Sequence, residues 1–67
     1  MNILAIEGKK YRCKNGETAT VVCANFGMFG RSTMICNISD GQRLRYDLDG
    51  KVDAINIHEY DLVENIK

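Results

Sequence analysis

Residues 36–52, CNISDGQRLRYDLDGKV, contain two Asx-Gly pairs, each flanked by short runs in which apolar and polar residues alternate. A third pair, Asn15-Gly16, lies in the same setting nearer the N-terminus. An Asx-Gly pair between alternating runs is the strongest short-range signal for a β-hairpin. The chain is therefore expected to be all-β, folded as a small antiparallel meander or an SH3-like barrel of five to six short strands.

The length of each hairpin loop decides which side chains share a face of the sheet. A two-residue loop at Asn15-Gly16 mixes apolar and polar residues on both faces, whereas the three-residue loop 14–16 separates them. The longer loop pairs Tyr11 with Ala19 and Arg12 with Thr18. A one-residue slip in the strand pairing moves every side chain to the opposite face of the sheet. The longer loop is therefore preferred at this turn, because it places the apolar side chains together on one face. Its glycine should adopt the left-handed conformation of a G1 bulge.

The same choice at the other two pairs gives loops 39–41 and 48–50. The first places Cys36 opposite Leu44 and Met34 opposite Tyr46. The second sets three cross-strand pairs, which are Asp47 with Lys51, Tyr46 with Val52, and Leu44 with Ala54. The Asp47–Lys51 pair joins opposite charges, which stabilises a hairpin.

These registers predict strands near residues 9–14, 17–25, 31–38, 42–48, 51–57 and 60–64. Residues 2–6 are expected either to add an edge strand or to be frayed. Side chains on the apolar face should form the core. The predicted inward set is Tyr11, Cys13, Ala19, Val21, Cys23, Met34, Cys36, Ile38, Leu44, Tyr46, Leu48, Val52, Ala54 and Leu62.

The length of 67 residues indicates a single small domain, residues 1–67. A domain of about 60 residues buries only about 60% of its unfolded surface, so its stability is marginal. A compact barrel and self-association are expected to supply the additional stability, and a homo-oligomer is predicted. The N-terminus lacks the basic and apolar regions of a secretory signal, and no stretch could span a membrane. We therefore expect a cytoplasmic protein with reduced cysteines.

The formal charge is zero but unevenly distributed. Residues 1–46 hold seven bases and three acids, a balance of +4, and residues 47–67 hold two bases and six acids, a balance of −4. Solvated strand faces explain this most simply, and a dipolar surface for a partner is the alternative.

Four basic residues fall on the outward face, and they are the candidate binding residues: Lys10, Arg12, Arg43 and Arg45. They could hold a small anionic ligand in a cleft between subunits. They could also bind nucleic acid, but neutral overall charge and the inward placement of Tyr11 and Tyr46 disfavour that interpretation.

The residues that could carry chemistry do not form a recognisable catalytic or metal-binding set. Cys13, Cys23 and Cys36 lie at inward positions without a CxxC pair, which is typical of buried small hydrophobes. His58 is the single histidine, with no nucleophile elbow or phosphate loop elsewhere. The acidic stretch 47–53 lacks the acids that an EF-hand requires at its first and twelfth positions. No enzyme activity, metal or cofactor is therefore expected.

The least typical segment is residues 25–30, which carry three large apolar side chains interspersed with two glycines. A loop between strands is usually polar. These side chains should either plug one end of the barrel or form a contact surface for self-association or a partner. The candidate interface residues are Phe26, Met28 and Phe29.

The spacing of turn and strand residues resembles a group of small phage and prophage proteins. The matching elements span residues 8–64: Gly8-Lys9-Lys10-Tyr11, Asn15-Gly16 with Ala19 and Val21, Asp40-Gly41, Asp49-Gly50, and Asp61-Leu62-Val63-Glu64. The resemblance implies a β-rich accessory protein that acts by binding, as host-takeover or counter-defence factors do. The leading hypothesis is a non-enzymatic inhibitor that occludes a host protein or sequesters a small anionic, nucleotide-like ligand. A nucleic-acid-binding barrel and a structural assembly subunit are the alternatives.

Overall fold

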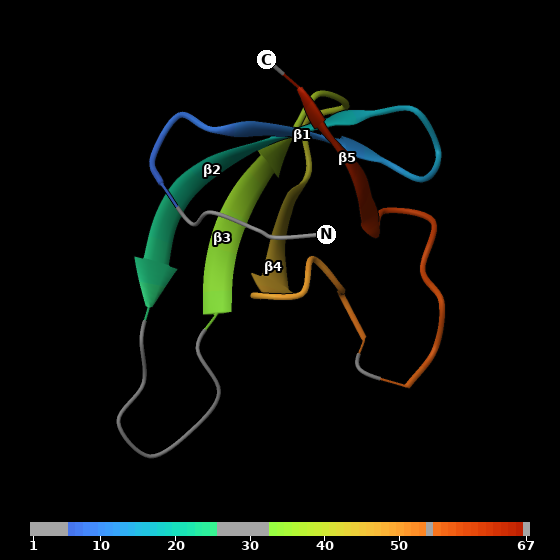
Figure 1. Ribbon diagram of the computed structural model, residues 1–67. Coiled ribbons are helices and arrows are strands. Elements are labelled where there is room, and N and C mark those ends of the chain that lie inside the picture. The colour runs from blue at the N-terminus through green and yellow to red at the C-terminus, as the bar shows by residue number, and fades with distance from the viewer. Residues whose placement is uncertain (1–5, 26–32, 54, 67) are drawn as a thin grey trace.

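The computed structural model describes residues 6–25, 33–53 and 55–66, and every regular element among them is a strand (Figure 1). All neighbouring strands are antiparallel, and the sheet has the order β4-β3-β2-β1-β5. It curls into a half-barrel, which confirms the all-β prediction. The strands are β1 (Lys10–Cys13), β2 (Thr18–Asn25), β3 (Thr33–Ile38), β4 (Arg43–Asp47) and β5 (Leu62–Ile66).

All three Asx-Gly turns close with the same pair of backbone hydrogen bonds. The carbonyl of the residue before each three-residue loop (Cys13, Ile38 or Asp47) accepts a hydrogen bond from the glycine N–H. The N–H of that same residue donates to the carbonyl of the residue after the glycine. Gly16, Gly41 and Gly50 have φ angles of 93°, 99° and 82°. This is the left-handed region, where a residue with a Cβ is strained. The predicted three-residue loops with a left-handed glycine are confirmed.

The first two hairpins have the predicted registers. Tyr11 pairs with Ala19 and Arg12 with Thr18 across β1 and β2. Met34 pairs with Tyr46 and Cys36 with Leu44 across β3 and β4. Segregation of apolar from polar side chains was therefore sufficient to choose the loop length at these turns.

A β-bulge in β2 overturns the predicted position of one cysteine. Val21 pairs with Cys36 but Cys23 pairs with Ile35, so the register shifts at Val22. The extra residue turns the rest of β2 over, as a bulge does. Cys23 is therefore exposed on the outer face, and Ala24 packs against the core in its place.

The predicted strand at residues 51–57 is wrong. The Asp47–Lys51 turn forms, but residues 51–53 and 55–57 contain no strand. The last strand begins two residues later than predicted, at Leu62, and it pairs with β1 instead of with its neighbour in sequence. The plain meander is thereby replaced by a sheet in which the C-terminal strand closes onto the first. Ile6 lies outside the strands, and residues 2–5 are outside the described part.

The core lies on the inner side of the curl. Of the predicted inward set, nine members are buried: Tyr11, Cys13, Ala19, Val21, Met34, Cys36, Ile38, Tyr46 and Leu62. Leu44 and Val52 pack against this core while partly exposed, Leu48 is half-buried, and Ala54 is outside the described residues. Tyr60 is a core member that the sequence pattern did not predict. Among residues 6–25, 33–53 and 55–66 there is no helix of the length and apolarity that crossing a membrane requires.

Candidate functional site

The long segment between β4 and β5 is tied to the core by a buried tyrosine. The Tyr46 hydroxyl donates a 2.6 Å hydrogen bond to the carbonyl oxygen of Tyr60. It also lies 3.7 Å from the thiol sulfur of Cys13. Burial raises the pKa of Tyr46, so this side chain stays a neutral donor. The segment is thus fixed near its C-terminal end.

A buried carboxylate fixes the same segment at two further points. Asp61 is only 9% exposed. Its carboxylate oxygens accept 3.0 Å hydrogen bonds from the backbone N–H groups of Val52 and His58. A carboxylate that accepts backbone hydrogen bonds organises a loop more strongly than a neutral acceptor does. Val52 and His58 are therefore both held by one side chain.

The histidine has a structural role in this loop. Its Nδ1 atom accepts a 3.1 Å hydrogen bond from the backbone N–H of Tyr60, and the two rings lie 5.8 Å apart between centroids. Its backbone carbonyl also accepts a hydrogen bond from the N–H of Asp61. These contacts shape the turn that leads into β5.

Between the tied ends, the loop presents two isoleucines to solvent. The Asp53 carboxylate accepts hydrogen bonds from the N–H groups of Ile55 at 2.9 Å and Asn56 at 3.4 Å, which is a local Asx turn. The same bonds lower the pKa of Asp53. Ile55 is 90% exposed and Ile57 is 76% exposed. We call residues 53 and 55–57 the isoleucine loop.

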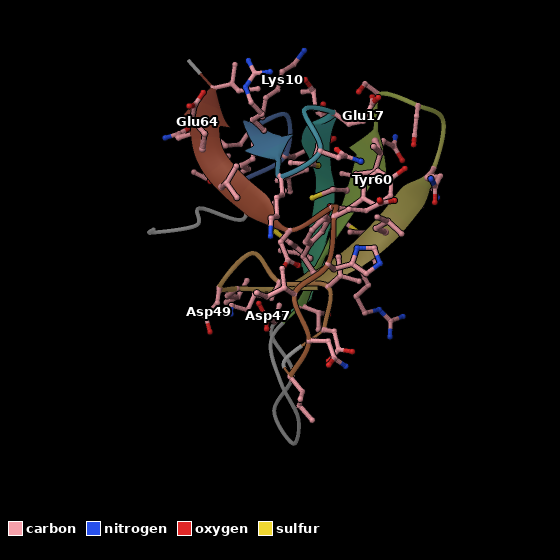
Figure 2. The ribbon with its side chains drawn as sticks, turned by 90° about the vertical axis from the view of Figure 1, so that its right-hand side faces the viewer. Lys10, Glu17, Asp47, Asp49, Tyr60 and Glu64 are labelled. Atoms are coloured by element: carbon pink, nitrogen blue, oxygen red, sulfur yellow. The ribbon has the colours of Figure 1, made fainter. Side chains whose placement is uncertain are left out.

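The end of the half-barrel near the first two turns is closed by a polar network. The Tyr60 hydroxyl contacts the Asp40 carboxylate and accepts a 2.7 Å hydrogen bond from the Gln42 side chain. The Ser39 hydroxyl contacts the Glu17 carboxylate. Glu17 and Tyr60 lie on one side of Figure 2, away from Asp47 and Asp49. The hydrogen bond from the Tyr60 hydroxyl to the Asp40 carboxylate lowers the pKa of Asp40 and raises the pKa of Tyr60. These contacts hold the turns together.

The four predicted binding residues are exposed on the outer face, but they form two separate pairs. Lys10 and Arg12 lie on β1, and Arg43 and Arg45 lie on β4. Lys10 and Arg43 occupy one cross-strand row, with Thr20 and Asn37 between them. At about 4.8 Å per strand, their backbones are roughly 14 Å apart. The outer side of the curl is convex, so side chains from the two pairs diverge.

Two of these four bases already have polar partners. Arg12 lies 3.4 Å from Glu64 in an exposed ion pair, which contributes little stability. Arg43 donates a 3.0 Å hydrogen bond to the Asn37 side chain. Tyr11 and Tyr46 are fully buried on the inner side. Of the four predicted anion-binding residues, Lys10 and Arg45 are therefore the two whose side chains have no ion pair or hydrogen bond to another described residue.

The cysteines are not brought together. Cys13 and Cys36 are buried in the core, whereas Cys23 faces outward. Burial raises the pKa of the Cys13 thiol, and it raises that of Cys36 to about 12. Within the described ranges no group of three or more His, Cys, Asp or Glu side chains is arranged to hold a metal ion.

The predicted interface residues Phe26, Met28 and Phe29 lie outside the described residues. The sequence pattern does not reveal the isoleucine loop, because Val52 and Ala54 on one face with Ile55 and Ile57 on the other are compatible with a strand. Comparisons of the chain with known protein families, with curated proteins and with solved structures return no match. The geometry of these surfaces is therefore the basis for a functional proposal.

Proposed function

We propose that the protein is a non-enzymatic binding module that acts by occluding a surface of another protein, with Ile55 and Ile57 at the contact. The observation that supports this function is the exposure of both side chains, at 90% and 76%, on a loop tied by hydrogen bonds. Single exposed apolar residues are common on protein surfaces. Two exposed isoleucines on one loop that is already held by hydrogen bonds favour an interface, because binding then loses little conformational entropy.

The acids around the loop suggest the character of the partner. Asp53 begins the isoleucine loop and Glu59 follows it, and both are exposed. Charged residues typically rim an apolar contact. The matching surface on the partner is therefore an apolar patch bordered by basic residues. Occlusion of a host protein by a phage-type factor is one form of this proposal, and it is supported by the resemblance in turn and strand residues alone.

The other candidate functions receive less support from the described residues. Nucleic-acid binding through Lys10, Arg12, Arg43 and Arg45 would proceed without aromatic stacking from Tyr11 or Tyr46, because both rings are buried. A small anion bound within one chain would meet one basic pair only. Homo-oligomerisation and an assembly role through Phe26, Met28 and Phe29 stay predictions.

Site-specific photocrosslinking in the producing cells tests the proposal. A photoreactive residue at position 55 should capture a defined protein, and the same residue at Val63, which is 54% exposed on β5, should not. Ile55→Ser with Ile57→Ser should abolish retention of that protein on the immobilised chain, while Val63→Ser should not. If both variants retain the protein equally, or if only nucleic acid is recovered and salt removes it steeply, the isoleucine loop is not the binding surface.

A further inference from the structure

The edge of the sheet at β4 carries backbone groups that the described structure leaves unpaired. Backbone groups alternate in direction along a strand, and Gly41 and Gln42 bond to Ile38 in the turn that starts β4. Leu44 and Tyr46 therefore point their N–H and C=O groups towards β3. Arg43 and Arg45 point theirs away from the sheet.

Asp47 confirms this alternation, because its backbone groups should point in the same direction as those of Arg43 and Arg45, away from β3. Its N–H donates to Lys51 and its carbonyl accepts from Gly50, both in the turn beyond the edge. The Gln42 carbonyl accepts from Ile38, and the Gln42 N–H donates to Asp40. The open edge groups are therefore the backbone N–H and C=O of Arg43 and Arg45.

After the Asp47–Lys51 turn the chain runs back towards this edge, but beyond Lys51 its described residues do not pair with β4. Had the third hairpin continued, Asp53 would lie opposite Arg45 and Ile55 opposite Arg43. Instead, the Val52 N–H donates to the Asp61 carboxylate, and the segment turns away after Lys51. The turn that would direct an intramolecular strand is therefore retained, while its second strand is diverted.

We propose that the β4 edge accepts a short extended segment of another protein that has acidic side chains at alternate positions. Such a segment adds to the sheet by hydrogen bonding to Arg43 and Arg45, a recognised mode of peptide binding. Two acids of the segment then lie beside the two guanidinium groups on the outer face. The residue between them faces inward and covers Leu44, which is half-buried.

The arginines also determine what the edge excludes. Charged side chains on an edge strand commonly protect it from pairing with another copy. Antiparallel pairing of two β4 strands centred on any residue from Arg43 to Arg45 places arginines opposite one another. Since like charges opposite one another are destabilising, a second copy is disfavoured and an acidic strand is selected.

Titration of the intact protein with the peptide acetyl-Ser-Glu-Val-Glu-Val-Glu-Ser-amide tests this proposal. We expect binding, with new protection from hydrogen exchange at the Arg43 and Arg45 amides. The peptide with lysine in place of glutamate should not bind. The glutamate peptide N-methylated at its glutamate residues, whose N–H groups would face β4, should not bind either. Arg43→Glu with Arg45→Glu should weaken binding by about tenfold or more, through loss of two charge pairs and new repulsion.

A matched control separates local from general charge effects. Lys9→Glu with Lys14→Glu makes the same change in net charge away from the β4 edge and should leave binding within about twofold, since distant surface charges are screened. Ile55→Ser with Ile57→Ser should also leave it intact, because this edge is distinct from the isoleucine loop. The proposal is overturned if the acidic peptide fails to bind, or if the N-methylated peptide binds equally well. It is also overturned if the two amides are already protected in a dimer of the protein alone.

Discussion

Asp61 accepts a 3.0 Å hydrogen bond from the backbone N–H of Val52, and this contact directs the chain away from the β4 edge. The same carboxylate accepts from His58, so one side chain defines the segment that carries Ile55 and Ile57. The fold, the exposed isoleucines and the open edge thus depend on a shared contact.

Replacement of this carboxylate should destabilise the domain. In Asp61→Asn, an amide NH₂ group must face one of two backbone N–H donors, so a part-buried donor loses its partner. We expect a loss of about 2–3 kcal/mol in the free energy of unfolding, measured by urea denaturation. Glu59→Gln, at an exposed neighbouring position, is the control. Equal stability of Asp61→Asn and wild type would show that the carboxylate does not hold the loop.

Tyr46→Phe should also destabilise the fold, through a different mechanism. The Tyr60 carbonyl loses the donor that lies 2.6 Å away and stays buried without it. The expected cost is about 1–3 kcal/mol, with an unchanged denaturant slope because the folded state keeps its compactness. A cost near zero would mean that the Tyr46 hydroxyl makes no net contribution to the fold.

Thiol labelling should divide the cysteines into two classes. Ellman's reagent should modify Cys23 in the folded protein, and Cys13 and Cys36 only after denaturation, because both are buried with raised thiol pKa values. Cys23→Ser should then remove the native reaction. Rapid labelling of all three thiols under native conditions would contradict the packing of the core, and protection of Cys23 would contradict the bulge at Val22.

Alanine and asparagine should destabilise the protein to different extents when they replace a left-handed turn glycine. Gly16→Ala and Gly41→Ala would place a Cβ in open space, so the expected cost is conformational, about 1–2 kcal/mol each. Gly16→Asn should cost less, because asparagine tolerates this region better than alanine. Thermal denaturation provides the comparison. Equal stability of Gly16→Ala and wild type would contradict the turn geometry.

The Asp40–Tyr60 contact should stabilise the protein only over a window of pH. The pKa of Asp40 is lowered in the folded state, so its contribution is present above its ordinary value near 4 and is lost as the pH falls further. The pKa of Tyr60 is raised, so its contribution is complete below about pH 10 and is lost as the pH rises through the folded value. Tyr60→Phe should reduce the loss of stability at both the acidic and the alkaline end of this pH window. Parallel pH profiles for Tyr60→Phe and wild type would contradict this coupling.

The parts of the fold that depend on neighbouring residues could be predicted from sequence. Loop length, the left-handed glycines and the first two registers follow from apolar alternation within a few residues of each turn. The bulge could not be predicted, because Val21, Val22 and Cys23 are all compatible with continuous alternation. Its position depends on how β2 fits β3.

The errors near the candidate site arise from contacts distant in sequence. Local preference favours a strand at residues 51–57, but Asp61 diverts Val52 and β5 pairs with β1. Propensity is overridden where such tertiary contacts compete with it. The exposure of Ile55 and Ile57 follows from that competition, so periodicity alone could not identify them. Lys10, Arg12, Arg43 and Arg45 were correctly placed outside, but their division between β1 and β4 required the sheet order.

Native-state amide hydrogen exchange along β4, resolved by residue, is the most direct test of the diverted third hairpin. The amides of Leu44 and Tyr46 should be protected by β3, while those of Arg43 and Arg45 should exchange rapidly into solvent. Asp61→Ala should shift this pattern if residues 52–57 then pair with β4. Strong protection of Arg43 and Arg45 in the wild-type monomer, with cross-strand contacts to Asp53 and Ile55, would show that the third hairpin is complete and the edge is closed.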